Sequence, residues 1–223
     1  MKCKQEIITT RAVGFDFFNT LVQAEANWEV CILSMGEYLQ SQGYDFPIEL
    51  FVSRYRKVAT AYRTKRYKNL QEVGNHILVS ETLRMIVIGA KSADPHVTSA
   101  VEHYFTPWKI TLAPDAHRVL EDLNGRFTLS LISNFTNSAF LNRSLNNLGI
   151  NRFFDHIIDS LSIGWRKPHQ RIFKHFLDLS GVKAKEAIFI GDDLNADIKG
   201  AKNLGIKAVL LKKSEDIESN SID

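Results

Sequence analysis

The chain has 223 residues, of which 44% are hydrophobic and 24% are charged. This length and composition fit a globular protein with one large domain, or a core with a smaller companion. The net charge of +3, from 28 basic and 25 acidic residues, gives no argument for nucleic-acid binding. The two cysteines, Cys3 and Cys31, form neither a disulfide framework nor a zinc-binding pattern.

Neither end of the sequence nor its apolar runs indicate a membrane protein. The first ten residues contain Lys and Glu and lack an apolar stretch of signal-peptide length. The longest apolar run, near Met85–Ala90, is far too short for a membrane span. We therefore expect a soluble, cytoplasmic protein, present as a monomer or a homodimer.

Five short apolar runs, each bounded by turn residues, predict buried strands. Helical periodicity and helix-capping residues predict four helices among them. The alternation of strands and helices indicates an α/β fold, a doubly wound, Rossmann-like parallel sheet with helices on both faces. The predicted strands are Ala12–Phe18, Thr128–Ser133, His156–Ser160, Ala187–Gly191 and Ala208–Leu211, and the predicted helices are Pro114–Leu123, Ser138–Leu148, His169–Leu179 and Asn195–Leu204.

The stretch from about Gln23 to Trp108 breaks this alternation. It reads as consecutive helices with no convincing strand, and it predicts a small all-helical domain inserted after the first strand. We expect a core formed by residues 1–22 and 108–223 and a helical domain formed by residues 23–107. Two apolar stripes at helical spacing support this interpretation: Trp28, Cys31, Ile32, Met35 and Leu39, and then Phe51, Tyr55, Val58 and Tyr62.

Four segments place polar residues at or near the ends of predicted strands. In a doubly wound sheet, ligands bind at the carboxyl edge of the strands. The sequence therefore predicts one site built from all four segments. They are Gly14–Leu21 (GFDFFNTL), Leu131–Asn134 (LISN), Gly164–Pro168 (GWRKP), and Phe189–Asp193 (FIGDD) with Asp197 beyond it.

In order, spacing and context, these segments resemble the motifs of the haloacid-dehalogenase superfamily. The resemblance covers residues 12–21 and 111–211, and the helical insertion lies where that superfamily carries a C1-type cap. It implies a Mg²⁺-dependent hydrolase, most simply a phosphatase of a small phosphorylated metabolite. The nucleophile would be Asp16, which would form an aspartyl-phosphate and so divide one difficult step into two.

The resemblance also implies roles for the other residues of these segments. Ser133 would bind phosphate oxygens and Lys167 would supply fixed positive charge, which phosphoryl transfer needs. Mg²⁺ prefers oxygen ligands, so Asp16, Asp192 and the backbone carbonyl of Phe18 would hold it. Asp193 or Asp197 would lie behind, bonded to Lys167 or to a metal-bound water. The remaining candidates for substrate binding are Asn19, Thr20 and Asn134.

One position departs from the phosphatase pattern. Most phosphatases of the superfamily carry a second aspartate two residues after the nucleophile, where it acts as general acid and base. Here that residue is Phe18, which cannot transfer a proton. General acid–base catalysis typically contributes about 10²–10⁴-fold. A phosphatase with this sequence would need good leaving groups, such as acyl or aryl phosphates, or a proton donor from elsewhere.

Three other functions remain open. A dehalogenase-like enzyme carries an aromatic residue at this position and a second motif like Ser133–Asn134, although the paired acids Asp192 and Asp193 would repel its carboxylate substrate. Phosphonoacetaldehyde hydrolysis would need a Schiff-base lysine in the cap, for which Lys57, Lys65 and Lys68 are candidates. A phosphate-binding or regulatory protein with little turnover is the third alternative.

A basic stretch in the predicted cap has no acid within it. We interpret it as the solvated face opposite the buried stripe, with anionic-substrate binding and nucleic-acid binding as alternatives. His169, beside the Lys167 motif, is interpreted as a surface residue and, alternatively, as a proton donor. The basic residues are Arg54, Arg56, Lys57, Arg63, Lys65, Arg66 and Lys68.

Overall fold

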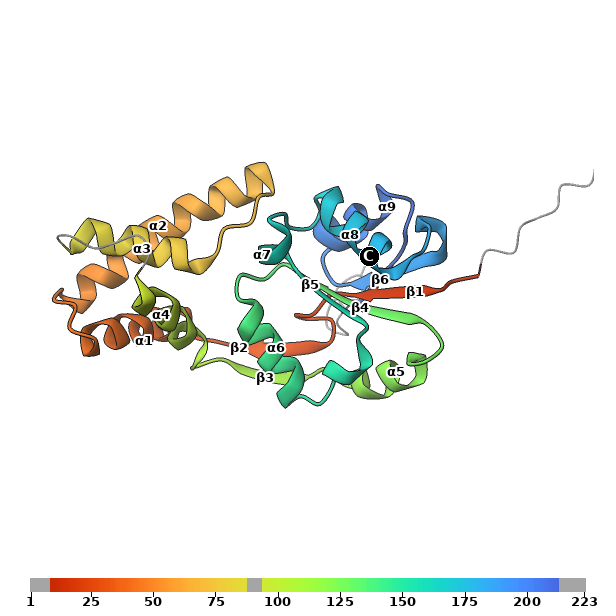
Figure 1. Cartoon of the computed structure of the whole chain (residues 1–223), viewed down its shortest axis with the longest axis horizontal. Coiled ribbons are helices and arrows are strands. Elements are labelled where there is room, and N and C mark those ends of the chain that lie inside the picture. The colour runs from red at the N-terminus through yellow and green to blue at the C-terminus, as the bar shows by residue number, and fades with distance from the viewer. Residues whose placement is uncertain (1–8, 88–93, 213–223) are drawn as a thin grey trace, which may run out of the picture.

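The computed structural model describes residues 9–87 and 94–212. A parallel sheet with its helices forms one end of the molecule, and a group of helices forms the other (Figure 1). Cys3, residues 88–90 of the apolar run, and the outer ends of the predicted core, 1–8 and 213–223, lie outside the described residues.

The sheet has five strands in the order β5-β4-β1-β6-β7, and every neighbouring pair is parallel. The central strand β1 is buried along its whole length. After β1 the chain builds β4 and β5 on one side and then β6 and β7 on the other. The predicted α/β doubly wound fold is confirmed. The strands are β1 (Ala12–Phe15), β4 (Thr128–Ser133), β5 (His156–Asp159), β6 (Ala187–Gly191) and β7 (Lys207–Leu210).

Helices cover both faces of this sheet. Two separate apolar clusters result, one containing Leu120 of α5 and Leu141 of α6, the other containing Phe173 and Phe176 of α8. Burial on both faces explains the almost uniformly apolar strands. These elements are α5 (Ala116–Leu123), α6 (Ser138–Asn147), η1 (Asn151–Phe153), α7 (Ser160–Ile163), α8 (Gln170–Ser180), η2 (Ala184–Glu186), η3 (Leu194–Lys199) and α9 (Gly200–Lys202).

In its described part, the stretch between β2 and β3 forms four helices: α1 (Trp28–Ser41), α2 (Ile48–Asn69), α3 (Asn75–Ile86) and α4 (Pro95–Phe105). The four helices agree with the predicted helical insertion, but residues 23–25 of the predicted range belong to a strand, and the boundaries of a separate domain stay a prediction. The two predicted stripes are largely buried between these helices, but Trp28 is 53% exposed. Trp28 therefore belongs to the surface of this group, which we call the cap.

The structure differs from the prediction at the junctions. The first strand ends at Phe15, because Asn19 has a left-handed φ of 58° and the backbone N–H of Val22 returns to the carbonyl of Phe17. β2 (Val22–Glu25) and β3 (Lys109–Leu112) were not predicted; they form an antiparallel pair that connects core and cap (Figure 1). Each has four residues, too few for a clear alternation of apolar and polar residues.

Two further elements differ from the sequence prediction. The predicted helix 195–204 is a π-helix, η3, followed by the short α9. β5 stops one residue early because the Asp159 carboxylate accepts a hydrogen bond from the backbone N–H of Ser162 and so caps α7.

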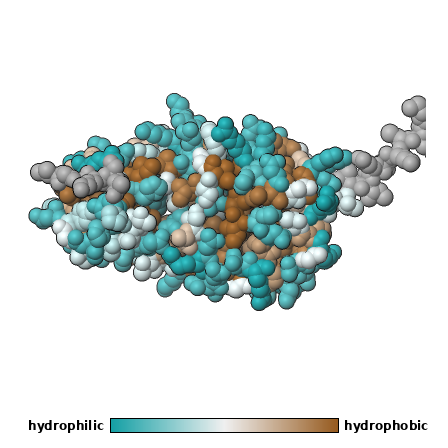
Figure 2. Space-filling model, in the orientation of Figure 1, coloured by the Kyte–Doolittle hydropathy of each residue, from teal (hydrophilic) through white to brown (hydrophobic). Residues whose placement is uncertain are grey.

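Hydrophilic side chains cover most of the visible face of the molecule, and apolar ones gather toward its middle (Figure 2). Among the described helices, none combines the length and the hydrophobicity that a membrane crossing requires.

Candidate active site

The polar residues of the four segments converge where the strand order reverses. Asp16 follows β1, Ser133 ends β4 and Asp192 follows β6, so all three lie at the carboxyl edge of adjacent strands. Ligands bind at this position in doubly wound sheets. A cleft of about 220 Å³ opens there, which we call the site cleft. Its lining residues are Asp16, Phe18, Asn19, Ser133, Asn134, Arg166, Lys167, Asp192, Asp193, Ala196 and Asp197.

Lys167 is the buried cation of the site cleft, with 2% of its side chain exposed. Its Nζ lies 2.5 Å from Asp16 Oδ1, 2.7 Å from Asp197 Oδ1 and 2.8 Å from the carbonyl oxygen of Ile132. Burial disfavours the charged amine, but attraction to the two carboxylates outweighs it and raises the pKa of Lys167. Lys167 therefore remains an ammonium group.

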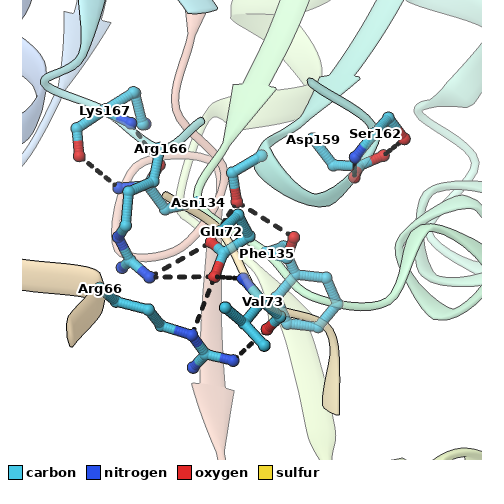
Figure 3. Close-up of polar contacts among 10 residues, drawn as sticks. Arg66, Glu72, Val73, Asn134, Phe135, Asp159, Ser162, Arg166 and Lys167 are labelled. Atoms are coloured by element: carbon cyan, nitrogen blue, oxygen red, sulfur yellow. Dashed lines mark hydrogen bonds and ion pairs between the residues drawn. The ribbon is translucent and has the colours of Figure 1, made fainter. Parts of the chain in front are cut away.

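Asn134 fixes the backbone that carries this lysine. Its Nδ2 donates to the carbonyl of Lys167 at 3.0 Å, and its Oδ1 accepts from the Lys167 backbone N–H at 2.7 Å. Both polar atoms of the amide are thus engaged within the protein (Figure 3). The predicted contact of Asn134 with substrate stays a prediction.

Asp16 has an unusual protonation equilibrium. Burial, reinforced by the nearby charge of Asp197, raises its pKa from 3.8 to about 6, although Lys167 opposes the shift. Thr20 Oγ1 donates to Asp16 Oδ2 at 3.4 Å, so the predicted substrate residue Thr20 contacts the nucleophile candidate instead of lining the site cleft. Near neutral pH, Asp16 is mostly an ionised carboxylate beside a fixed ammonium group.

Three carboxylates can reach a single cation. Oxygen atoms of Asp16, Asp192 and Asp197 lie within 4.8 Å of one another. Burial and the charge of Asp197 raise the pKa of Asp192, to which the Asn19 side chain donates a hydrogen bond. A Cβ at residue 191 would lie 2.3 Å from Asp197 Oδ2, so only glycine lets this carboxylate approach β6. Carboxylate oxygens from three residues are ligands of the kind that Mg²⁺ prefers.

The two predicted supporting acids have different surroundings. The Asp197 carboxylate forms an ion pair with Lys167, which is one of the two arrangements that the resemblance implied. The Asp193 carboxylate instead accepts from the backbone N–H groups of Asn195 and Ala196, and so caps η3. Ligation by the Phe18 carbonyl stays a prediction.

Ser133 provides an unsatisfied hydroxyl. The residue is 1% exposed, and its buried Oγ has no hydrogen-bond partner among the described residues. Buried hydroxyl groups without a partner are uncommon. Ser133 and Lys167 both line the site cleft, so this hydroxyl is a candidate to bind a phosphate oxygen.

Phe18 forms an aromatic wall of the site cleft. Its ring centroid lies 4.8 Å from that of Phe17, 5.2 Å from Phe135 and 5.8 Å from Trp108. His169 does not line the site cleft; it stacks on Trp165 at 4.0 Å, and burial together with Arg171 lowers its pKa. The structure thus supports the interpretation of His169 as a residue outside the site. No lining residue other than an aspartate offers a carboxyl or imidazole group to replace an acid at position 18.

Sequence reasoning missed Arg166 and its cap partner Glu72. The Glu72 side chain is completely enclosed and joins Arg166 Nη1 at 3.2 Å to Arg66 Nε at 3.1 Å (Figure 3). Ser160 Oγ donates to it at 2.6 Å. Arg66, expected on a solvated face, is thus largely enclosed, with 14% of its side chain exposed. Arg166 had one signal, its position beside Lys167, whereas no sequence pattern marked Glu72.

Backbone pairing reinforces this contact between cap and core. Gln71 forms an isolated antiparallel bridge with Trp165. The backbone N–H of Glu72 donates to the carbonyl of Gly164, and that of Arg166 to the carbonyl of Leu70, each at 3.0 Å. The loop between α2 and α3 therefore holds the segment that carries Lys167.

The lysine candidates for Schiff-base chemistry lie elsewhere. Lys57, Lys65 and Lys68 are exposed on α2, and none of them lines the site cleft.

Comparisons with known proteins agree with this fold. Ribulose-1,5-bisphosphate 5-phosphatase of Halopiger xanaduensis is 29% identical over 216 residues, which cover 93% of this chain and 87% of the relative. Glyceraldehyde 3-phosphate phosphatase of Pyrococcus abyssi is 49% identical over 65 residues, but these cover only 29% of this chain and 27% of the relative. In fold, the chain is similar to 2-haloacid dehalogenase from Pseudomonas syringae pv. Tomato, with a TM-score of 0.71, 20% identity and coverage of 91% and 86%.

The family model for haloacid dehalogenase-like hydrolases matches residues 10–205, which include the cap and every strand of the parallel sheet except β7. All four sequence segments lie within the matched residues. The chain therefore belongs to the haloacid dehalogenase-like hydrolase family.

Proposed function

We propose that this hydrolase is a Mg²⁺-dependent phosphatase, which acts on a small phosphorylated metabolite through an aspartyl-phosphate on Asp16. One observation carries the proposal: Asp16, Lys167, Asp192 and Asp197 form a charged cluster in a cleft that Ser133, whose Oγ has no partner in the described chain, also lines. Two relatives are named as phosphatases of phosphorylated sugars, which supports phosphate chemistry.

In the proposed reaction, an Asp16 carboxylate oxygen attacks phosphorus. The bond from phosphorus to the leaving oxygen breaks, and the electron pair departs with that oxygen. Lys167 and Ser133 stabilise the non-bridging oxygens with a charge and a hydrogen bond. Water then attacks the phosphorus of the acyl phosphate, which releases phosphate and restores Asp16. The attack needs ionised Asp16, and its pKa of about 6 keeps most of it ionised above pH 7.

The other site residues hold the metal ion or keep the reacting side chains in position. Asp16 and Asp192 would hold Mg²⁺, together with the Phe18 carbonyl, and the bound ion would neutralise charge on the phosphoryl oxygens. Asp197 orients Lys167, Asp193 caps η3, and Asn134 fixes the backbone of Lys167. Asn19 supports Asp192 and Thr20 supports Asp16. We further propose that residues 23–107 form a cap domain on a core of residues 1–22 and 108–223, and that this cap shields the site from water.

A 2-haloacid dehalogenase-like activity is the second candidate, favoured by the aromatic wall at Phe18. Halide needs no acid to leave. However, Asp192 and Asp197 lie beside Asp16 and would repel a carboxylate substrate. A phosphate-binding protein with little turnover would keep the same groups but release no phosphate.

The test is hydrolysis of acetyl phosphate and para-nitrophenyl phosphate, with Mg²⁺ and with a chelator. Asp16→Asn is the test variant, and Asp122→Asn on exposed α5 is the matched control. Release that needs Mg²⁺, is lost in Asp16→Asn and persists in Asp122→Asn supports the proposal. Absence of phosphate release from both compounds would contradict it. Halide release from 2-haloacids would then support the second candidate, and fluoroberyllate binding without any turnover would support a binder.

A further inference from the structure

A second hollow, larger than the site cleft, lies within the cap. Its volume is about 540 Å³, and residues of α1, α2, α3 and α4 line it. We call it the cap cavity. Small-molecule sites commonly measure about 300–1,000 Å³. The site cleft, at about 220 Å³, is smaller than this range, so a larger substrate would extend beyond it.

The lining of the cap cavity is basic. Arg56, Arg63 and Arg66 contribute to it, and none of its lining residues is acidic. The spacing of seven and three residues places the three arginines on the same side of α2. Trp28 and Tyr104 add aromatic surface. Three guanidinium groups and two aromatic rings in one lining are suited to an anionic organic molecule.

Arg63 and Asn75 are among the polar side chains of this lining that have no partner within the described residues. Arg56 pairs with Glu29 at 2.8 Å and Arg66 pairs with Glu72, but Arg63 makes no ion pair or hydrogen bond in the part of the chain that the structure describes. Asn75 is 8% exposed, and within the same residues its side-chain amide has no hydrogen bond either. Asn75 lines the cap cavity, so its amide is available to hydrogen-bond a polar ligand atom there.

Two chains of contacts join the cap cavity to the site cleft. In one, Arg66 of the cavity and Arg166 of the cleft share the Glu72 carboxylate. In the other, the Trp108 ring lies between Tyr104 of the cavity, at 6.5 Å, and Phe18 of the cleft, at 5.8 Å. Along each chain of contacts, a single residue, Glu72 or Trp108, therefore separates the two hollows.

We propose that the cap cavity binds a second anionic group of the substrate, with Arg63 as its unpaired cation and Asn75 as a hydrogen-bond partner. The inference rests on the proposed function and refines it. The substrate is then a short carbon chain with a phosphate at Asp16 and a second phosphate or a carboxylate at Arg63. A single charge-assisted hydrogen bond corresponds to about tenfold in affinity.

The experiment measures competition against para-nitrophenyl phosphate hydrolysis, so the probes need not be turned over themselves. The probes are pentyl phosphate, pentane-1,5-diol bisphosphate and 6-phosphohexanoate, with bisphosphates of three to six carbons to find the optimal span. The wild-type protein should prefer at least one doubly anionic probe to its singly anionic analogue by at least about tenfold. Arg63→Gln should reduce this preference about tenfold, whereas Lys57→Gln, a charge-matched change on α2 outside both hollows, should keep it.

A preference for a bisphosphate probe would identify the second anionic group as a phosphate, and a preference for 6-phosphohexanoate would identify it as a carboxylate. Equal inhibition by singly and doubly anionic probes at every length would overturn the subsite, and so would equal preferences in Arg63→Gln and Lys57→Gln. An Arg63→Gln variant that weakens both kinds of probe alike would also overturn it. These results leave the phosphatase proposal intact. Absence of any Asp16-dependent hydrolysis of para-nitrophenyl phosphate would overturn both proposals together.

Discussion

Replacing Lys167 by methionine tests the electrostatic design of the site. Methionine keeps the length and apolar stem of lysine but removes the ammonium group, which contacts Asp16 at 2.5 Å and Asp197 at 2.7 Å. Both carboxylates then stay buried without their cation. Breaking a buried ion pair costs about 3–5 kcal/mol in the free energy of unfolding. For a chain of this size, this corresponds to a fall in Tm of about 6–20 °C.

The loss of stability should depend on pH in a defined direction. Burial already raises the pKa of Asp16 to about 6 in the folded state, from its ordinary 3.8, although Lys167 opposes the shift. Without the ammonium group, that pKa rises further. A raised carboxyl pKa contributes stability that is fully present below about pH 4 and is lost as pH rises through the folded pKa. The gap between wild type and Lys167→Met should therefore be widest above pH 6 and narrow toward pH 4–5.

The assay is urea denaturation with chelator present, at pH 5 and at pH 8. The control is Lys174→Met on the exposed side of α8, which should stay within about 0.5 kcal/mol of wild type. A destabilisation by Lys167→Met below about 1 kcal/mol, or one of equal size at both pH values, would refute the reasoning.

Three further predictions follow from other parts of the site. Because Phe18 offers no proton, kcat/KM should fall steeply as the leaving-group pKa rises; an equal rate across aryl and alkyl phosphates would show another donor. Because Asp192 is one of three carboxylates that lie close together, Mg²⁺ should raise the Tm of the wild-type protein more than that of Asp192→Asn. Equal Tm shifts of the two proteins in calorimetry would argue against this metal site. Because the enclosed Glu72 carboxylate is the partner of both Arg66 and Arg166, Glu72→Gln should destabilise the protein by about 3 kcal/mol, whereas exposed Glu121→Gln should not. Urea denaturation of the two variants measures this difference, and equal midpoints would count against the ion-pair role.

The sheet and the convergence of the motifs were predictable for a geometric reason. Apolar runs such as Thr128–Ser133 report burial on both faces, and parallel strands bring their carboxyl ends to one edge. Asp16, Ser133 and Asp192 each follow or end such a strand, so their proximity follows from the strand order. Their local sequence was sufficient to place them.

The β2–β3 pair and the π-helix were not predictable in this way. β2 has the sequence VQAE and β3 has KITL, and each acquires its strand conformation by pairing with a segment more than 80 residues away. In η3, Asp193 caps the start while Asp197 turns inward to Lys167, so tertiary contacts override the regular helix that the periodicity suggested. Propensity alone carries no information about either effect.

Glu72 and Arg166 show why function was harder to predict than fold. They are 94 residues apart, on the cap and on the core, and they meet only because the α2–α3 loop pairs with the segment before Lys167. Trp28 and Arg63 likewise acquire a meaning only from the cavity that they share. In the proposed reaction, residues at the ends of neighbouring core strands position the phosphoryl group. The remainder of the proposed substrate meets the cap cavity, which residues from four different helices line. In this proposal, the choice of substrate depends on contacts that no single segment of the sequence contains. The motifs were therefore sufficient to predict the reaction type, whereas the substrate class could be proposed only from the cap cavity.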